Sequence, residues 1–196
     1  MFNAVSNKLT EALVVNGIID NEDVELYNIG FQCGILVILN LFCVLITGVF
    51  LGIFAESAIF IFSFFILRIC ANGFHTKSIY SCFCISYVIE FAILLGIKYI
   101  PVNGSSAVIM AIIMAVISRF CPVPNENKQY NEKEISYCRK LFLVIFGVEL
   151  AMVLIFALMI LSSFCSAIIY GWALYTLLNV MGHLQNQWRL RHPTSI

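Results

Sequence analysis

The chain has 196 residues, of which 61% are hydrophobic and only 11% are charged, and its formal net charge is zero. Soluble domains average about 25% charged residues, so this composition excludes an ordinary soluble protein and indicates a membrane protein. A net charge of zero gives no whole-protein attraction to nucleic acid, so no nucleic-acid partner is expected.

The N-terminal segment, residues 1–28, is predicted to stand apart from a single membrane domain formed by residues 29–196. Residues 2–19 are predicted to form an amphipathic helix, because apolar side chains recur near one face. These apolar residues are Phe2, Val5, Leu9, Leu13 and Val14. Such a helix either lies on the bilayer surface or helps to gather a substrate.

Six apolar segments follow, and they predict an all-α polytopic membrane bundle with six transmembrane segments. Their bounds are 30–50, 52–67, 79–97, 105–118, 141–161 and 164–183. The first, third, fifth and sixth have the length of about 17–25 residues that crosses the hydrocarbon core. The second and fourth are short, so they either span with little tilt, thin the bilayer or re-enter.

The distribution of lysine and arginine predicts the orientation. With six spans and a cytoplasmic N-terminus, only Lys98 lies outside. The cytoplasmic side then holds Lys8, Arg68, Lys77, Arg119, Lys128, Lys133, Arg139, Lys140, Arg189 and Arg191. The positive-inside rule therefore places both termini in the cytoplasm. Re-entry of the two short segments gives nearly the same balance but moves His75 outside; we expect six spans and a cytoplasmic His75.

A polar island at residues 68–82 separates two apolar runs and contains His75 and Cys82. A free thiol has a pKa of about 8.5, and a histidine can remove its proton to form a thiolate nucleophile. Seven residues of straight helix rise about 10 Å, so the pair can meet only if the backbone bends. Asn72 and Gly73 supply residues that tolerate such a bend. Cys82 would then lie in the first turn of the next helix, where the helix dipole favours a thiolate.

Two other interpretations of this island stay open on spacing alone. The histidine can be merely solvated and the cysteine merely packed. A zinc site could use His75, Cys82 and Cys84, but the two cysteines point to different faces of a helix and no fourth ligand is evident. We therefore expect no metal. The eight cysteines also lack the spacing of a secreted disulfide framework.

Two carboxylates lie within apolar segments, Glu90 and Glu149. Membrane-embedded carboxylates are costly and often functional, so either residue is a candidate third group that orients His75. The alternative for each is a protonated side chain hydrogen-bonded between helices.

The largest polar loop is expected at residues 119–140, with a basic run formed by Lys128, Lys133, Arg139 and Lys140. This run either contacts lipid headgroups and sets the topology or docks an acidic substrate tail.

The island and the loop together resemble the AgrB family of bacterial membrane endopeptidases. The family pattern of arginine, glycine, histidine and cysteine is matched at Arg68, Gly73, His75 and Cys82, and a second similar segment is Cys121-Pro122-Val123-Pro124-Asn125-Glu126-Asn127-Lys128. One departure is Asn72, where family members often have a second glycine. The similarity in length, hydropathy and order of features covers nearly the whole chain.

The resemblance implies a cysteine endopeptidase that removes the C-terminal tail of a quorum-sensing peptide precursor. The remainder is held as a thioester and then closed into a thiolactone or lactone. It implies that Cys82 is the nucleophile and His75 the general base, with Gly73 and Arg68 in support. Arg68 either recognises the acidic tail or steadies the oxyanion, or it only marks the cytoplasmic end of a helix.

These inferences together predict a multi-pass protein of the bacterial cell membrane that needs no cofactor. Its expected partners are the peptide precursor, the lipid bilayer and, in one arrangement, a second copy of the chain. The rival reading is a small peptide transporter without covalent chemistry, in which Glu90 and Glu149 lie on the transport path.

Overall fold

The computed structural model describes residues 2–69, 79–117, 120, 122 and 131–191, and it confirms the all-helical prediction for these residues. Seven α-helices and one short 3₁₀ helix account for its regular structure. In chain order they are α1 (Phe2–Val15), η1 (Asn21–Asp23), α2 (Val24–Leu51), α3 (Phe54–Ile69), α4 (Ile79–Tyr99), α5 (Gly104–Ile117), α6 (Glu132–Leu158) and α7 (Ser162–Arg191).

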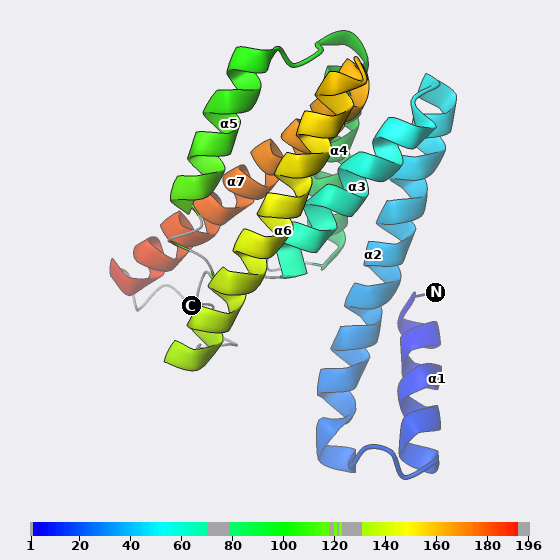
Figure 1. Cartoon of the computed structure of the whole chain (residues 1–196). Helices are drawn as coiled ribbons and strands as arrows, with labels where there is room; N and C mark the ends of the chain where they lie inside the picture. Colours follow the sequence, from blue (N-terminus) through cyan, green and yellow to red (C-terminus); the bar gives the residue numbers. More distant parts are fainter. Residues whose placement is uncertain (1, 70–78, 118–119, 121, 123–130, 192–196) are drawn as a thin grey trace.

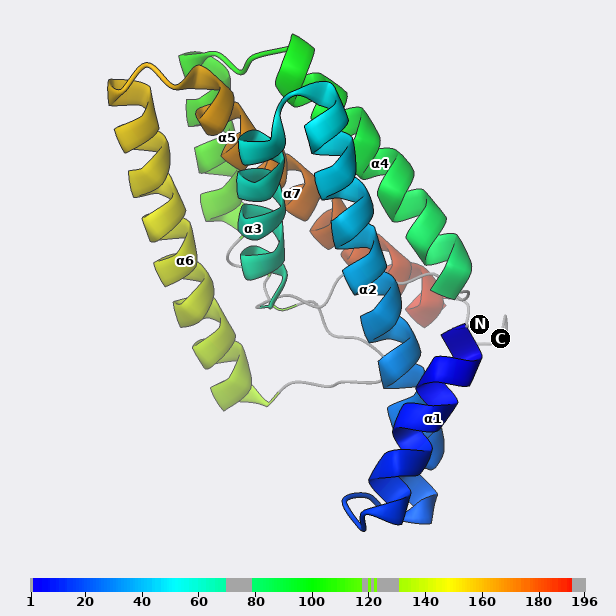
Figure 2. The same ribbon diagram turned by 90° about the vertical axis from the view of Figure 1, so that its right-hand side faces the viewer.

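Helices α2 to α7 run alternately up and down and form one bundle, as Figures 1 and 2 show. Helix α7 packs against α3, α4, α5 and α6, whereas α1 packs beside the N-terminal part of α2. The core therefore centres on α7, whose Trp172 is fully buried between α6 and its other neighbours. Each of the six predicted apolar segments thus corresponds to one helix, and consecutive helices run in opposite directions.

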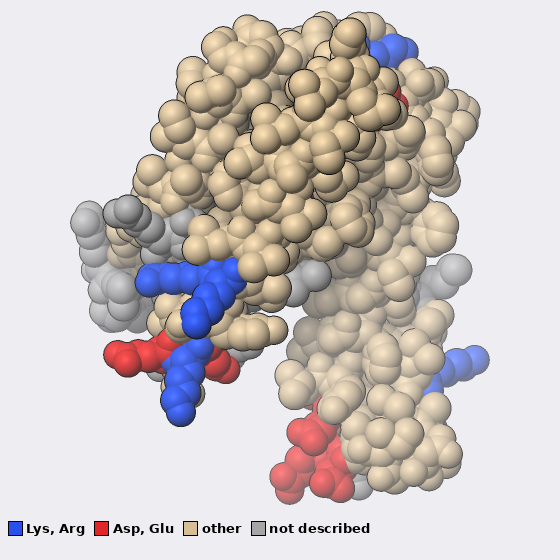
Figure 3. All heavy atoms as spheres, in the orientation of Figure 1, with Lys and Arg blue, Asp and Glu red and all other residues tan. Residues whose placement is uncertain are grey.

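Three helices are long and apolar enough to cross a membrane, counted over the described residues: α2, α6 and α7. Helix α5 is apolar but has only 14 residues, and α3 has 16, as their short predicted segments suggested. On the face shown in Figure 3, charged side chains lie toward the two ends of the molecule, with a broad uncharged region between them. The protein thus has the character of a membrane protein, while the number of spans stays a prediction.

Helix α6 begins at Glu132, earlier than the predicted apolar segment of residues 141–161. The backbone N–H of Asn131 donates a 2.9 Å hydrogen bond to the Glu134 carboxylate, one of the two contacts of a capping box. The prediction that residues 132–140 belong to a polar loop is therefore wrong. The capping contact stabilises the start of the helix, so this stretch can be helical although its side chains are mostly polar. Helix α7 likewise continues beyond residue 183 to Arg191.

The predicted N-terminal helix is present, but its apolar stripe is not the face that packs on the protein. Ser6 and Thr10 are buried against α2, whereas Val5 and Leu9 are exposed. Thr10 turns its hydroxyl back to the carbonyl of Ser6, which satisfies it inside the contact. Val5 and Leu9 are consequently free for contact with lipid, whereas Leu13 and Val14 are half-buried.

The connection between α2 and α3 requires two glycines. Gly52 ends α2 with a φ of 73°, a left-handed conformation that costs glycine little. Gly48 lies where α3 crosses α2, and a Cβ at this position would be 2.7 Å from Cβ of Ser57. Because Cβ of Ser57 belongs to the helix framework, rotation of its side chain cannot relieve this clash.

Substitution of Gly48 with alanine is expected to destabilise the protein by about 1–3 kcal/mol, the cost of overpacking a tight contact. The matched control is Gly34→Ala in the same helix, where a new Cβ meets no atom within 4 Å. That change should leave stability unchanged or raise it, since alanine is the better helix former. Unfolding of both variants in detergent tests this, and equal midpoints would contradict it.

Candidate functional site

Polar side chains join α2 and α4 inside an otherwise apolar bundle. Nδ2 of Asn40 in α2 donates a 2.5 Å hydrogen bond to Oε2 of Glu90 in α4, and both side chains are buried. The hydroxyl groups of Thr47 and Tyr87 form a second bond of 2.9 Å between the same helices. An unpaired polar group in hydrocarbon costs several kcal/mol, so these bonds favour one fixed register of α4 on α2.

A cavity of about 310 Å³, here called the Asn40–Glu90 cavity, lies between α2, α3, α4 and α7. Its polar lining consists of Asn40, Glu90, Ser86, Arg68 and Cys33. Its apolar lining consists of Leu36, Val37, Phe64, Phe65, Phe83, Ile89, Leu174 and Leu178. Apolar walls with a few polar groups are typical of a small-ligand or side-chain binding site.

Arg68 brings a positive charge to this cavity from the last turn of α3. Its guanidinium lies over the ring of Phe64, with 5.7 Å between Cζ and the ring centroid. A cation near the C-terminal end of a helix is favoured by the helix dipole, and the aromatic face supports it further. The cavity therefore has a cation and a carboxyl group in one small, mostly apolar space.

Cys82 is the fourth residue of α4, which begins at Ile79, so the prediction that it lies in a first helical turn is confirmed. Ser86 and Ile89 follow it by four and seven residues, spacings that put all three positions on one side of a helix. Both Ser86 and Ile89 line the Asn40–Glu90 cavity. The backbone thus places position 82 on the cavity side of α4, one turn before the first of these lining residues.

Several predicted site residues lie outside the described parts of the chain. They are His75 and Gly73 in the connection from α3 to α4, and Lys128 in the connection from α5 to α6. The side chain of Cys82 also lies outside them, although its backbone is described. Of the predicted catalytic and supporting residues, the structure therefore describes the side chain of Arg68.

Of the two buried glutamates, only Glu90 lies in the cavity beside α4. Glu149 lines a different cavity between α3, α6 and α7, and its Oε2 accepts a 2.6 Å hydrogen bond from Nε1 of Trp172. Since α3 contributes different residues to the two cavities, its Ser63 to one and its Phe64 to the other, the glutamates do not share a site. Of the two glutamates, Glu90 is therefore the one whose cavity is lined by residues of α4.

The basic residues of the second predicted group lie on α6. Arg139 and Lys140 line a shallow groove with Glu132 and Ser136 near the start of that helix, and Lys133 lies in its first turn. Cations and carboxylates are thus interspersed here. The described part of this region therefore does not form a uniformly positive surface for docking an acidic tail.

Sequence analysis missed two residues that hold the buried carboxyl groups, Asn40 and Trp172. Asn40 is a single amide within an apolar run, the same signal that singled out Glu90, so it could have been found. Trp172 gave no such signal, because a tryptophan in an apolar segment usually serves packing. No cluster of three or more possible metal-ligating residues occurs in the described ranges, which leave out His75.

Comparison with known protein families gives a match to the family described as AgrB, accessory gene regulator B, over residues 6–179. Comparison with curated proteins and with solved structures gives no match. The matched region contains α2 to α6 in full, the Asn40–Glu90 cavity and most of α7.

The Asn40–Glu90 hydrogen bond is expected to couple the two residues energetically. The double variant Asn40→Ala/Glu90→Ala should depart from additivity of unfolding free energies by about 0.5–3 kcal/mol, because either single change leaves a buried polar partner. Asn40→Ala combined with Glu149→Ala is the control, and it should be additive within about 0.5 kcal/mol. Denaturant unfolding in detergent gives both values, and additivity in the first pair would disprove the coupling.

Proposed function

The chain belongs to the AgrB family, which implies a part in processing a quorum-sensing peptide, and we propose that it is a membrane cysteine endopeptidase. The proposed reaction removes the C-terminal tail of a peptide precursor and closes the remainder into a thiolactone or lactone. The observation that carries this proposal is the position of Cys82 in the first turn of α4, beside a largely apolar cavity.

In the proposed chemistry, His75 takes the proton of the Cys82 thiol, and the thiolate attacks the carbonyl carbon of the scissile peptide bond. The carbon–nitrogen bond breaks, the proton passes to the leaving amine, and the tail departs. The remainder stays on Sγ as a thioester. A thiol or hydroxyl of the same peptide then attacks the thioester, forms the ring and returns the Cys82 thiol.

The location of Cys82 supports both halves of this reaction. The first N–H groups of α4, which have no partner within the helix, favour a negative charge on sulfur and lower the cost of forming the thiolate. The apolar walls of the adjoining cavity can hold an apolar part of the peptide and keep water from the thioester. Exclusion of water matters because hydrolysis would release an open chain in place of a ring.

Arg68 and Glu90 are proposed to support the cysteine. Arg68 either pairs with a carboxylate of the departing tail or stabilises the oxyanion, and its guanidinium already lines the cavity. Glu90 is proposed to orient His75, with Asn40 fixing the carboxyl group through their 2.5 Å hydrogen bond.

The proposed setting is the bacterial cell membrane, crossed by six spans with both termini in the cytoplasm. The alternating directions of α2 to α7 and the predicted excess of lysine and arginine on one side support this arrangement. The substrate then enters from the cytoplasmic side. The chain is also proposed to form a homodimer, since pairing buries exposed polar faces in the membrane.

One observation favours a second candidate, a small peptide transporter. Two buried carboxyl groups, Glu90 and Glu149, each line a cavity within the bundle, as groups on a transport path do. A transporter needs these carboxyls and not the thiol of Cys82, so the two candidates predict opposite effects of cysteine and glutamate substitutions.

Cys82→Ala is expected to abolish release of the tail when the protein is co-expressed with its precursor, because no nucleophile remains. Cys84→Ala is the matched control, since Cys84 lies two residues further along α4, is exposed and has no proposed role. Mass spectrometry detects the released tail and, in the active protein, the acyl-thioester. Cleavage by Cys82→Ala at the rate of the unchanged chain would leave the transporter as the better candidate.

Arg68→Lys is expected to lower the rate of tail release about tenfold, which corresponds to about 1.4 kcal/mol of transition-state stabilisation. Lysine keeps the charge but lacks the planar pair of donors that a carboxylate or oxyanion accepts. Lys98→Arg, at the opposite end of the bundle, serves as the control and should not alter the rate. Full activity of Arg68→Lys would mean that Arg68 only marks the end of α3.

A further inference from the structure

A second cavity, here called the Ser63–Glu149 cavity, lies between α3 and α6 and is closed at its inner side by Ile168 of α7. It has a volume of about 510 Å³, and Ser63 and Glu149 are its polar lining residues. Its other walls are aliphatic or aromatic, apart from Met152. The exposed rings and methyl groups of Phe62, Val144 and Val148 form part of its rim, so it opens on the outer, apolar face of the bundle.

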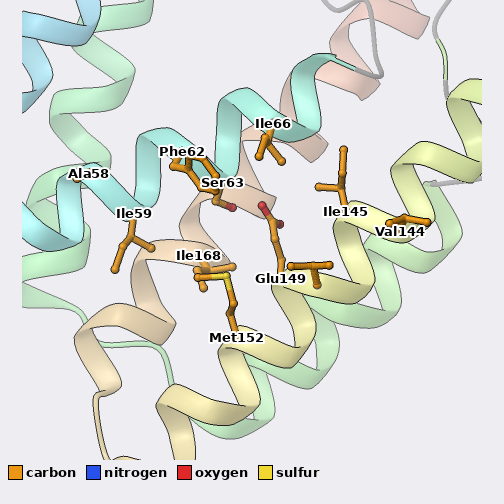
Figure 4. Close-up of a pocket in the computed structure, with 11 residues that line it drawn as sticks. Ala58, Ile59, Phe62, Ser63, Ile66, Val144, Ile145, Glu149, Met152 and Ile168 are labelled. Atoms are coloured by element: carbon orange, nitrogen blue, oxygen red, sulfur yellow. The ribbon is translucent and has the colours of Figure 1, made fainter.

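The polar groups of this cavity are buried but incompletely hydrogen-bonded. Glu149 is 5% exposed, and although Oε2 accepts from Trp172, Oε1 has no hydrogen-bond partner among the described residues. Ser63 is 2% exposed, and its Oγ lies near enough to the Glu149 carboxyl group to interact with it but forms no hydrogen bond of good geometry with any described residue. Figure 4 shows the two side chains pointing toward one another across the cavity from α3 and α6.

Both groups lie at a similar depth in the bundle. Ser63 comes nine residues after the first residue of α3, and Glu149 comes nine residues before the last residue of α6. These two helix ends lie toward the same end of the bundle (Figure 1), so each group is about 13 Å from it. Half of a hydrocarbon core of about 30 Å is about 15 Å, which places the pair near the middle of a bilayer.

An ordinary acyl chain would fill this cavity but leave both polar groups unpaired in hydrocarbon, a cost of several kcal/mol. A phospholipid headgroup stays at the interface and does not reach this depth, and a charged ligand is disfavoured there. A hydroxyl group fits the requirement, because it can donate to Oε1 of Glu149 and accept from Oγ of Ser63.

We propose that the Ser63–Glu149 cavity is a binding site for a neutral lipid alcohol, whose chain enters from the bilayer and whose hydroxyl bridges Ser63 and Glu149. The site is separate from the Asn40–Glu90 cavity and does not depend on the proposed peptidase chemistry. Gly171 of α7 leaves room for the Ser63 hydroxyl group. A Cβ at position 171 would lie 3.0 Å from Oγ of Ser63 and crowd it.

The test uses the full chain in phosphatidylcholine nanodiscs and a diazirine-bearing cetyl alcohol as the photoreactive probe. Labelling is expected on α3 or α6 beside the cavity, and unlabelled cetyl alcohol should compete for it. The methyl ether of the same probe lacks the O–H donor, so its labelling should be about tenfold weaker, the effect of losing about 1.4 kcal/mol of affinity.

Ser63→Ala should weaken labelling by the alcohol to a similar extent. Ser57→Ala is the matched control, because Ser57 is equally buried in α3 but its hydroxyl already donates to the carbonyl of Phe54, at 2.7 Å. Ala58→Phe, which fills the cavity from its wall, should remove labelling while leaving the thermal midpoint unchanged.

Three results would overturn the proposal. Equal labelling by the alcohol and its ether would show that only an apolar chain is bound. Equal labelling of Ser63→Ala and the unchanged chain would mean that Ser63 and Glu149 satisfy each other. Equal labelling of the same residues by a diazirine-bearing phospholipid would identify the occupant as bulk lipid.

Discussion

An unpaired polar atom in an apolar helical bundle is costly, and the hydrogen bonds that hold the two buried carboxyl groups constrain how the helices pack. Asn40 satisfies Glu90 between α2 and α4, and Trp172 satisfies one oxygen of Glu149 between α6 and α7. Aliphatic packing alone tolerates sliding and rotation of helices, whereas a hydrogen bond has a defined length and direction. The two carboxyl groups therefore fix the register of helices that composition would leave interchangeable.

The same constraint positions the cysteine. Helix α4 is held on α2 by the Asn40–Glu90 pair and by the Thr47–Tyr87 pair, and α2 also packs against α3. The start of α4 brings together a thiol position, a cavity with apolar walls and the guanidinium of Arg68. If the proposed chemistry is correct, this rigid support would hold Cys82 in place beside an apolar cavity.

The order of the helices could largely be predicted from the sequence, because long apolar runs indicate helices that are buried in lipid or in a protein core. Each predicted segment corresponds to one helix, and Cys82 falls in a first turn as its spacing indicated. The start of α6 was misplaced because its first turns are polar and depend on the contact of Asn131 with Glu134. Hydropathy cannot detect such a start.

The cavities could not be read from the chain, because each is formed by side chains from three or four helices. Nothing in the sequence separates Glu90 from Glu149, yet the fold puts them in different cavities. Asn40 was detectable in principle, as an amide in an apolar run, whereas the bond of Trp172 to Glu149 depends on how α6 meets α7. The roles of His75 and Cys82 rest on the family resemblance and on chemistry, and they stay predictions.

Helix α6 has a mechanical consequence, because it is unbroken from Glu132 to Leu158. An α-helix resists bending and stretching over this length, so its charged first turns and Glu149 move as one rod. Arg139 and Glu149 are ten residues apart, about 15 Å along the axis. A displacement of the polar end at Arg139 or Lys140 along the helix axis is therefore expected also to displace Glu149 relative to its partner Trp172 in α7.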